Sequence, residues 1–525
     1  MLNSKEEKPK TIIVYKAEAN LMKVSSLPST FVDDAIERNT IWLYDEKNCD
    51  KCQVVEQRHS EVCDACESFI GKRQMAKIVR RGENSYLSVP QGGVKRFENL
   101  LSDHNLKAEV IEKYGTSSNF HDTVKLTQEP RDWQKEALEV TLEKRRGIVV
   151  APPRSGKTFL AVMVSVSIQK KTLIIASQID WLEQFRKTYV GAEGEKAFTD
   201  IDPSRVGYFK SEEDVEKLDV CLATFSQFMS YKGKKLLESV RSKFGIIIAD
   251  EVHYTSALAT SRVLARFNSE FMLGLTGTPT RKRSSEDIIF RLLVGAVIYK
   301  AKVDMLKPEL VLLETNVTIN LPKGGNRLAY TRFIGKLETE KKRVKIICEY
   351  VAKAIGQGHS VMLPVQRAKS VKAYLDGINS YFDEAIAVRF DGTLSKGTGG
   401  LRELNLKKIK SGEARAIVGN ISLLSTGLNI PRLSMLIDRV TITSNIPKTE
   451  QRVSRILTPW AKKKQPKLVM VMDDCDIQRA TARNEYFNAI VPRFHPIASP
   501  EIRSKFANWL NKKKITSPLY GDNEL

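Results

Sequence analysis

The segment from Gly147 to Thr158 constrains the fold of this chain more than any other stretch. Residues 148–150 are a β-branched run suited to a buried strand, and Ser155-Gly156-Lys157-Thr158 leads into an apolar helix over 159–168. A strand, a tight loop and a helix start with Lys and Thr at the turn form the arrangement that cradles a nucleoside triphosphate. An ordinary strand-to-helix turn is the alternative.

The groups of this loop have distinct chemical roles. Backbone N–H groups and the helix N-terminus face the phosphates, the Lys ammonium reaches the β/γ oxygens, and the Thr hydroxyl ligates magnesium. The strict pattern has Gly where this chain has Ala151. We expect ATP to be bound by the residues of the loop and the helix start, Pro153, Arg154, Ser155, Gly156, Lys157 and Thr158.

The length and net charge of the chain limit the classes of protein to which it can belong. A chain of 525 residues is too long for one core, so two to four domains are expected. The balance of 84 Lys+Arg against 62 Asp+Glu leaves +22, which favours a nucleic-acid partner, with a merely basic surface as the alternative. No stretch approaches the ~20 apolar residues of a membrane span. Because the first ten residues are charged and lack an apolar signal core, we expect a cytoplasmic protein without membrane contact.

Four of the seven cysteines form two C-x-x-C pairs, Cys49/Cys52 and Cys63/Cys66, separated by ten residues. A tetrahedral Zn²⁺ ion takes four thiolates at about 2.3 Å, and each tight turn supplies two of them. His59 is a weaker candidate, while a redox pair or chance clustering is the alternative. We expect a structural zinc, because four Cys ligands leave no coordination site for water.

A basic run over 72–81 follows, and a second strand-like run covers 85–89. Together they predict a β-hairpin with a basic first strand. Such a face suits a phosphate backbone, and a solvated edge strand that discourages aggregation is an equal alternative.

From residue 126 short apolar strands alternate with amphipathic helices, which predicts a parallel sheet with helices on both faces. The apolar run 244–249 ends at Asp250-Glu251-Val252-His253. Carboxylates at the C-terminal end of a strand lie where an open α/β sheet presents its chemistry. Asp250 would hold Mg²⁺, and Glu251 would orient or deprotonate the attacking water. A solvated acidic turn is the alternative.

Asp250-Glu251-Val252-His253 resembles the motif that names the DEAD/H-box group of superfamily two helicases. The resemblance implies an adenine-reading role for Gln134 in Arg131-Asp132-Trp133-Gln134. It implies coupling of hydrolysis to strand movement for Leu275–Pro279, where the hydroxyls of Thr276 and Thr278 could sense the site. Segments 176–178 and 224–227 resemble those that contact the nucleic-acid backbone in relatives.

The alternation resumes over 305–490, with a predicted helix over 338–355 and a predicted strand over 361–365 among its elements. It contains no second phosphate loop, which suggests ATP bound between two lobes. Segment 424–431 resembles the fifth motif, with Gly427 and Asn429 as nucleotide-site positions, and Gln451 opens a segment that resembles the sixth. A charge must arrive from across the cleft to neutralise the departing γ-phosphate, and an Arg does this best. Arg455 is the first choice and Arg452 the second, with an exposed basic helix face as the alternative.

The resemblance covers about residues 129–475 and implies an α/β fold of two tandem RecA-like parallel-sheet domains. These are domain 1 over 126–304 and domain 2 over 305–490, preceded by a zinc-stapled α+β accessory domain over 1–125. A basic helix and tail over 491–525 would pack onto the second lobe. Ala151, Asn429, Ser454 and Thr458 depart from the family's pattern, and the last leaves the identity of the arginine finger open.

The implied activity is an ATP-dependent DNA helicase or translocase, similar to RecG-like, XPB-like and phage branch-migration enzymes, with nucleic-acid-stimulated ATP hydrolysis. Its cofactors would be ATP, Mg²⁺ and Zn²⁺, and its partner duplex, forked or branched DNA. RNA is the nearer rival partner, and a restriction-system translocase is another. A non-hydrolysing, ATP-gated nucleic-acid clamp is the alternative from a different class.

Overall fold

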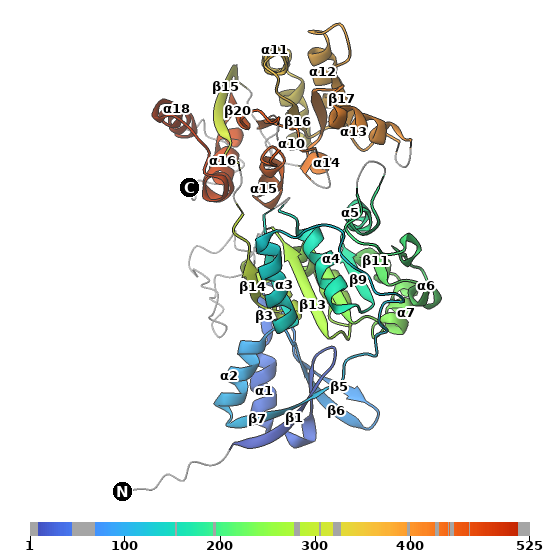
Figure 1. Cartoon of the computed structure of the whole chain (residues 1–525). Coiled ribbons are helices and arrows are strands. Elements are labelled where there is room, and N and C mark those ends of the chain that lie inside the picture. Colours follow the sequence, from blue (N-terminus) through green and yellow to red (C-terminus); the bar gives the residue numbers. More distant parts are fainter. Residues whose placement is uncertain are drawn as a thin grey trace. The chain divides into compact units, whose positions relative to one another are not determined.

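The computed structural model divides the chain into two compact units, 1–303 and 304–525 (Figure 1). Its described residues are 9–44, 69–152, 155–192, 196–277, 284–303, 306–318, 327–395, 399–425, 430–438, 440, 446–460 and 462–512.

The first unit opens with a five-stranded sheet of order β5-β6-β2-β1-β7, in which only β1 and β7 are parallel. The strands are β1 (Lys10–Lys16), β2 (Asn20–Lys23), β5 (Lys77–Arg81), β6 (Asn84–Val89) and β7 (Leu106–Glu112). Helices α1 (Ser29–Arg38) and α2 (Val94–Asp103) lie against this sheet. Alternate strand residues such as Ile12 and Val14 are buried with Phe31 of α1 and Leu100 of α2, so the two helices cover one face of the sheet.

The predicted basic hairpin is only partly right. β5 pairs with β6 as expected, but residues up to Gln74 belong to β4 (Phe69–Gln74), which pairs with β3 (Thr40–Tyr44) in a separate ribbon. The run is interrupted because Met75 donates its N–H to the carbonyl of Asn39 at 2.8 Å and Ala76 is fully buried. The zinc prediction at Cys49, Cys52, Cys63 and Cys66 lies outside the described residues.

A seven-stranded, wholly parallel sheet of order β10-β11-β9-β12-β13-β8-β14 forms the rest of this unit. The strands are β8 (Arg146–Val150), β9 (Thr172–Ala176), β10 (Val206–Tyr208), β11 (Val220–Thr224), β12 (Ile246–Asp250), β13 (Phe271–Thr276) and β14 (Val297–Lys300). The helices are α3 (Asp132–Lys144), α4 (Lys157–Ile168), α5 (Ile179–Val190), α6 (Glu212–Lys217), α7 (Tyr231–Val240), α8 (Leu258–Leu264) and α9 (Ser284–Val294).

Both faces of that sheet are buried. In β9, Leu173 and Ile175 pack in the apolar cluster that includes α7, α8 and α9, whereas Ile174 packs in the cluster that includes α3, α4 and α5. This two-sided burial explains the near-continuous apolar strands of the sequence. The predicted parallel α/β arrangement is confirmed here.

The second unit has a six-stranded parallel sheet of order β15-β20-β19-β16-β18-β17. The strands are β15 (Glu309–Thr318), β16 (Val361–Val365), β17 (Ala387–Phe390), β18 (Ala416–Asn420), β19 (Met435–Asp438) and β20 (Lys467–Asp474). Its helices are α10 (Arg327–Thr339), α11 (Lys341–Gly356), α12 (Ala368–Asn379), α13 (Leu401–Ser411), α14 (Ile421–Ser425), α15 (Ile446–Ser454), α16 (Asp476–Glu485), α17 (Val491–Phe494) and α18 (Pro500–Leu510). Helices again pack on both faces, so two parallel α/β sheets, consistent with two RecA-like domains, are present.

The helix predicted over 338–355 is interrupted. The carboxylate of Glu340 accepts the N–H of Arg343 at 2.6 Å and caps a new helix, α11, directly after α10. An N-cap acceptor of this kind satisfies a backbone donor that the first turn leaves unpaired.

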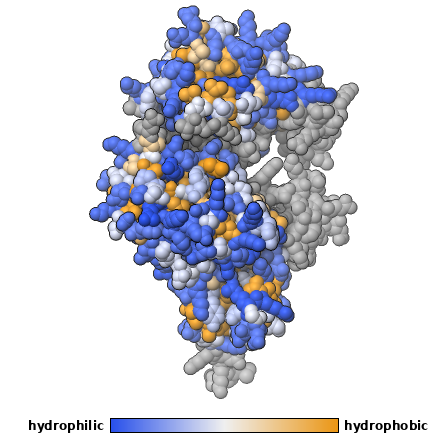
Figure 2. All heavy atoms as spheres, turned by 90° about the vertical axis from the view of Figure 1, so that its right-hand side faces the viewer, coloured by the Kyte–Doolittle hydropathy of each residue, from blue (hydrophilic) through white to orange (hydrophobic). Residues whose placement is uncertain are grey.

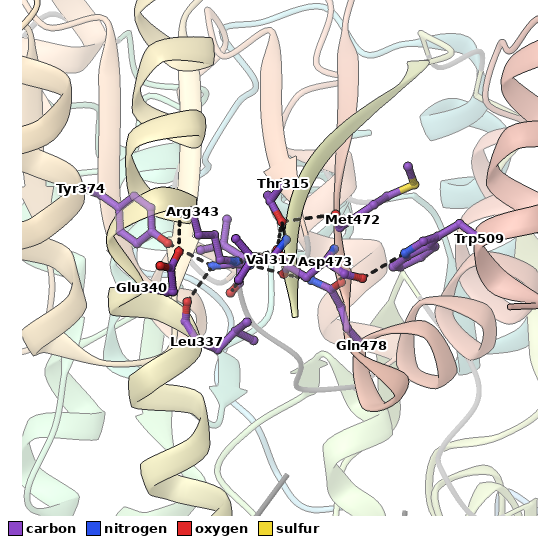
Figure 3. Close-up of polar contacts among 11 residues, drawn as sticks. Thr315, Val317, Leu337, Glu340, Arg343, Tyr374, Met472, Asp473, Gln478 and Trp509 are labelled. Carbon is purple, nitrogen blue, oxygen red and sulfur yellow. Dashed lines mark hydrogen bonds and ion pairs between the residues drawn. The ribbon is translucent and has the colours of Figure 1, made fainter. Parts of the chain in front are cut away.

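Arg343 is fully buried and lies at the centre of a polar network in the second unit (Figure 3). Its Nε donates to both carboxylate oxygens of Asp473 at 2.9 Å, and its terminal nitrogens donate to the Tyr374 hydroxyl at 3.1 Å and the Val440 carbonyl at 3.1 Å. The indole of Trp509 in α18 donates to the carbonyl of Asp473 at 3.0 Å. The network therefore joins α11, α12, α18 and the end of β20.

The face drawn in Figure 2 is mainly hydrophilic, with hydrophobic residues in small separate groups. Among the described residues, no helix combines the length and apolar character that a membrane crossing requires.

Candidate nucleotide-binding site

The loop between β8 and α4 has a backbone that requires glycine. Gly156 adopts φ +105°, and a Cβ there would lie 2.5 Å from Nε2 of Gln134. Ser155 is buried, and its hydroxyl has no hydrogen-bond partner among the described residues. A buried hydroxyl without a partner is costly unless a ligand completes it. Pro153 and Arg154, also expected to bind nucleotide, lie outside the described residues.

Two residues at the start of α3 hold the loop from behind. Arg131 donates from a guanidinium nitrogen to the carbonyl of Ser155 at 2.9 Å, and Gln134 donates from Nε2 to the carbonyl of Gly156 at 2.9 Å. Oε1 of Gln134 accepts the N–H of Arg131 at 2.8 Å. Gln134 is buried, so in this structure its amide supports the loop.

Lys157 is the first residue of α4 and is buried. Its Nζ donates to the carbonyl of Ala151 at 3.0 Å, within the loop that it would serve. Ala151 in turn donates its N–H to the carbonyl of Thr276 at 3.0 Å, which ties the loop to the end of β13. Thr158, the expected magnesium ligand, follows on α4 and is partly exposed.

The acidic pair lies at the end of β12. Asp250 is the last strand residue, and Glu251 turns the chain in a left-handed conformation with φ 45°. Thr276 donates its hydroxyl to Oε2 of Glu251 at 3.3 Å, and Nδ1 of His253 lies 2.9 Å from the same hydroxyl. A left-handed non-glycine residue is uncommon and persists where neighbours fix it.

The two carboxyl groups have opposite electrostatic environments. Burial, together with the negative charge of Glu251, raises the pKa of Asp250 above its usual range. Burial also opposes ionisation of Glu251, but Lys157 and His253 outweigh it and hold the pKa of Glu251 below its usual range. Such divergence within a pair is typical of sites that separate proton-accepting and ion-binding roles.

The structure thus gathers Lys157, Asp250, Glu251 and Gly156 at one edge of the seven-stranded sheet. Sequence reasoning missed the link from His253 through Thr276 to Glu251. Its sequence signals were His253, the fourth residue of the acidic motif, and the hydroxyl of Thr276, which the resemblance marked as able to sense the site.

The sixth-motif residues occupy different environments in the second unit. Arg452 is buried, with Nε 3.0 Å from Asp438 Oδ1 and a terminal nitrogen 3.4 Å from Glu485 Oε2. Arg455 follows the end of α15 and is partly exposed, and Gln451 is buried. Gly427 and Asn429 lie outside the described residues.

Comparison with known proteins gives partial matches. Residues 127–281 match the family ResIII, described as "Type III restriction enzyme, res subunit". The chain is 31% identical over 178 residues to "DNA 3'-5' translocase XPB2" of Sulfurisphaera tokodaii, covering 34% of this chain and 37% of that protein. It is 23% identical to protein L396 of Acanthamoeba polyphaga mimivirus, named for ATP-dependent RNA helicase activity, covering 71% of this chain and 70% of that protein.

Among solved structures, T4 UvsW aligns over 88% of this chain and 90% of its own, at 17% identity and a TM-score of 0.36. The chain spans less than half the length of the XPB-type relatives that it matches. The family match over residues 127–281 and the relatives together show a resemblance to the superfamily two helicases, specifically to the XPB-like and related translocases.

Proposed function

We propose that this chain is an ATP-dependent helicase or translocase that acts on DNA. The observation that carries the proposal is the position of Lys157. Its ammonium lies in the loop at the end of β8, and its charge acts on both carboxylates at the end of β12. A lysine shared by a phosphate-binding loop and an acidic pair is the arrangement that ATP hydrolysis requires.

The residues of this site fit a magnesium–triphosphate group. Gly156 keeps the loop open to a close backbone approach, the Ser155 hydroxyl is available as a donor, and Thr158 and Asp250 would hold the ion. Magnesium, when bound, neutralises charge on the phosphates. Glu251 is kept ionised beside Lys157, so it can accept the proton of the attacking water.

We propose Arg455 as the arginine that stabilises the leaving γ-phosphate. Arg452 already neutralises Asp438 and Glu485 inside the second unit, so its guanidinium is committed to that network. Gln451, Gly427 and Asn429 are proposed to complete the nucleotide site, and Arg131 and Gln134 to shape its loop.

DNA is the proposed partner because the chain carries a net charge of +22 and several relatives are named for DNA translocation. The name of the mimiviral relative favours RNA as the second candidate. Stimulation of ATP hydrolysis by single-stranded, duplex, forked and four-way DNA beside RNA, at a stated salt concentration, separates them. Equal stimulation by RNA would contradict the DNA assignment.

The site itself is tested with Lys157→Ala and Glu251→Gln. Removing a general base lowers turnover by about 10²–10⁴-fold, and loss of the loop lysine should abolish stimulated hydrolysis. Lys144→Ala and Glu143→Gln are matched controls, because this exposed pair ends α3 and should leave turnover unchanged. If turnover survives both site changes, the assignment is wrong.

The remaining sequence predictions extend the proposal. We propose the domain division 1–125, 126–304, 305–490 and 491–525, a cytoplasmic location, and a zinc ion on Cys49, Cys52, Cys63 and Cys66. Metal analysis of the full chain should find about one zinc per chain, lost in Cys49→Ser/Cys52→Ser. A folded parent protein without zinc would refute the zinc site.

A further inference from the structure

The second unit carries a group of cations at the sheet edge opposite its helicase-like motifs. Val361 of β16 aligns with Ala416 of β18 and Met435 of β19, and Met435 aligns with Lys467 of β20, so these parallel strands begin at one edge. The sixth motif instead follows β19, beyond the opposite edge. The residues that precede or begin these strands therefore lie at the edge opposite the one where β19 ends.

Four of these edge residues are basic: Arg415 precedes β18, Arg432 precedes β19, and Lys464 and Lys467 flank the start of β20. Two of these side chains approach Gly358. Cε of Lys464 lies 3.2 Å, and Nη2 of Arg415 lies 4.0 Å, from the position that a Cβ on Gly358 would take. We call Arg415, Arg432, Lys464 and Lys467 the edge cluster.

Little in the described structure neutralises the edge cluster. Arg415 Nε and Arg432 Nη1 are buried without a hydrogen-bond partner among the described residues. Glu309 lies 3.8 Å from Lys467, and Glu413 pairs with Lys408 at 2.8 Å. Burial, and to a lesser extent the positive charges of Lys467 and Lys464, lowers the pKa of His359 to about 4.

An exposed aromatic ring adjoins the edge cluster. The guanidinium of Arg432 lies 5.3 Å from the ring centre of Trp460, and 39% of Trp460 is exposed. Trp460 lines an open hollow of about 510 Å³ with Leu306, Pro459, Lys463, Lys464, Gln465 and Pro466. Lys463 fixes the wall of this hollow by donating to the carbonyls of Pro431 at 2.9 Å and Thr458 at 2.8 Å.

We infer that the hollow beside Trp460 and the edge cluster form a further nucleic-acid site on the second unit, which binds single-stranded nucleic acid. The cations of the edge cluster attract the phosphates, and an exposed ring offers a surface on which an unpaired base stacks. A duplex hides its base faces, so the ring favours a single strand. The choice of nucleic acid as the polyanion rests on the proposed function.

Binding of fluorescein-labelled oligothymidine to the full chain, followed by anisotropy across a salt series, tests the site. Trp460→Ala should weaken binding about tenfold, within the range that loss of base stacking produces. Arg415→Gln/Lys464→Gln removes two phosphate contacts and should reduce the slope of log K against log salt by about 1.4, or twice 0.7. Lys345→Gln/Lys372→Gln removes the same charge from exposed positions of α11 and α12 and should change neither quantity.

The binding test of this site and the ATPase test of the proposed function can fail independently. Trp460→Ala should keep the parent's ATP turnover at saturating DNA, so loss of ATPase in the parent refutes the motor and not this site. Photocrosslinking to iodouridine-substituted oligonucleotide should label the peptide that contains Trp460. The inference is overturned if crosslinks map only elsewhere, if the control variant weakens binding equally, or if polyglutamate competes as well as unlabelled oligothymidine.

Discussion

Replacing Arg343 by Met should destabilise the second unit strongly. The substitution keeps an unbranched side chain of similar length but leaves Asp473 buried without its cation, since both partners have fully buried side chains (Figure 3). Removing one partner of a buried ion pair costs about 3–5 kcal/mol. For a unit of 150–250 residues each kcal/mol shifts the melting midpoint by about 2–4 °C, so the expected shift is about 6–20 °C.

Calorimetry on the full chain, with hydrogen exchange of β20 and α18 to identify the unit that melts, measures this shift. Arg343→Met/Asp473→Asn should cost less than the sum of its two single changes, because the pair interacts directly. Lys353→Met is a matched control on the same helix, where Lys353 forms an exposed i,i+4 pair with Glu349, and should give no resolvable shift. An Arg343→Met shift no larger than the control's, or strict additivity in the double variant, would refute this reasoning.

Other changes test the remaining assignments. Gly156→Ala places a side chain at φ +105° and should weaken binding of a fluorescent ATP analogue by roughly tenfold; an unchanged Kd would contradict the loop geometry. Arg452→Ala should destabilise the second unit by about 3–5 kcal/mol, because it removes the cation that pairs with the buried carboxylates of Asp438 and Glu485. Arg455→Ala should keep the parent's melting midpoint and lower kcat by about 10³-fold or more; normal turnover would refute Arg455 as the finger. Folding lowers the pKa of His359 from 6.5 to about 4. Between these two pH values, the unfolded state therefore binds a proton that the folded state does not. The second unit should therefore lose stability between about pH 6.5 and 4, less so in His359→Asn; identical pH profiles in denaturant melts would contradict this.

The sequence was most informative where one local pattern decides the outcome. The apolar run before Asp250 predicts a buried strand, and the structure ends β12 at that residue. β16 likewise matches its predicted span, 361–365, because a short apolar run between turns leaves little freedom.

Contacts between distant residues were beyond such reasoning. Arg343 and Asp473 are 130 positions apart, and nothing local marks either as buried. Arg452 is a basic helix residue like many exposed ones, and only its packing against Asp438 and Glu485 shows a structural role. The interruption at Glu340 depends on a cap that helical periodicity does not reveal, since the apolar pattern continues through it.

The N-terminal sheet is joined to the rest of the first unit by close backbone packing. Gly92 donates its N–H to the carbonyl of Leu292 at 2.9 Å, where any larger residue would meet the backbone of α9, and Ile41 of β3 is buried in the core beneath the seven-stranded sheet. A ligand bound to this sheet would therefore move together with the phosphate loop, because both belong to the first unit.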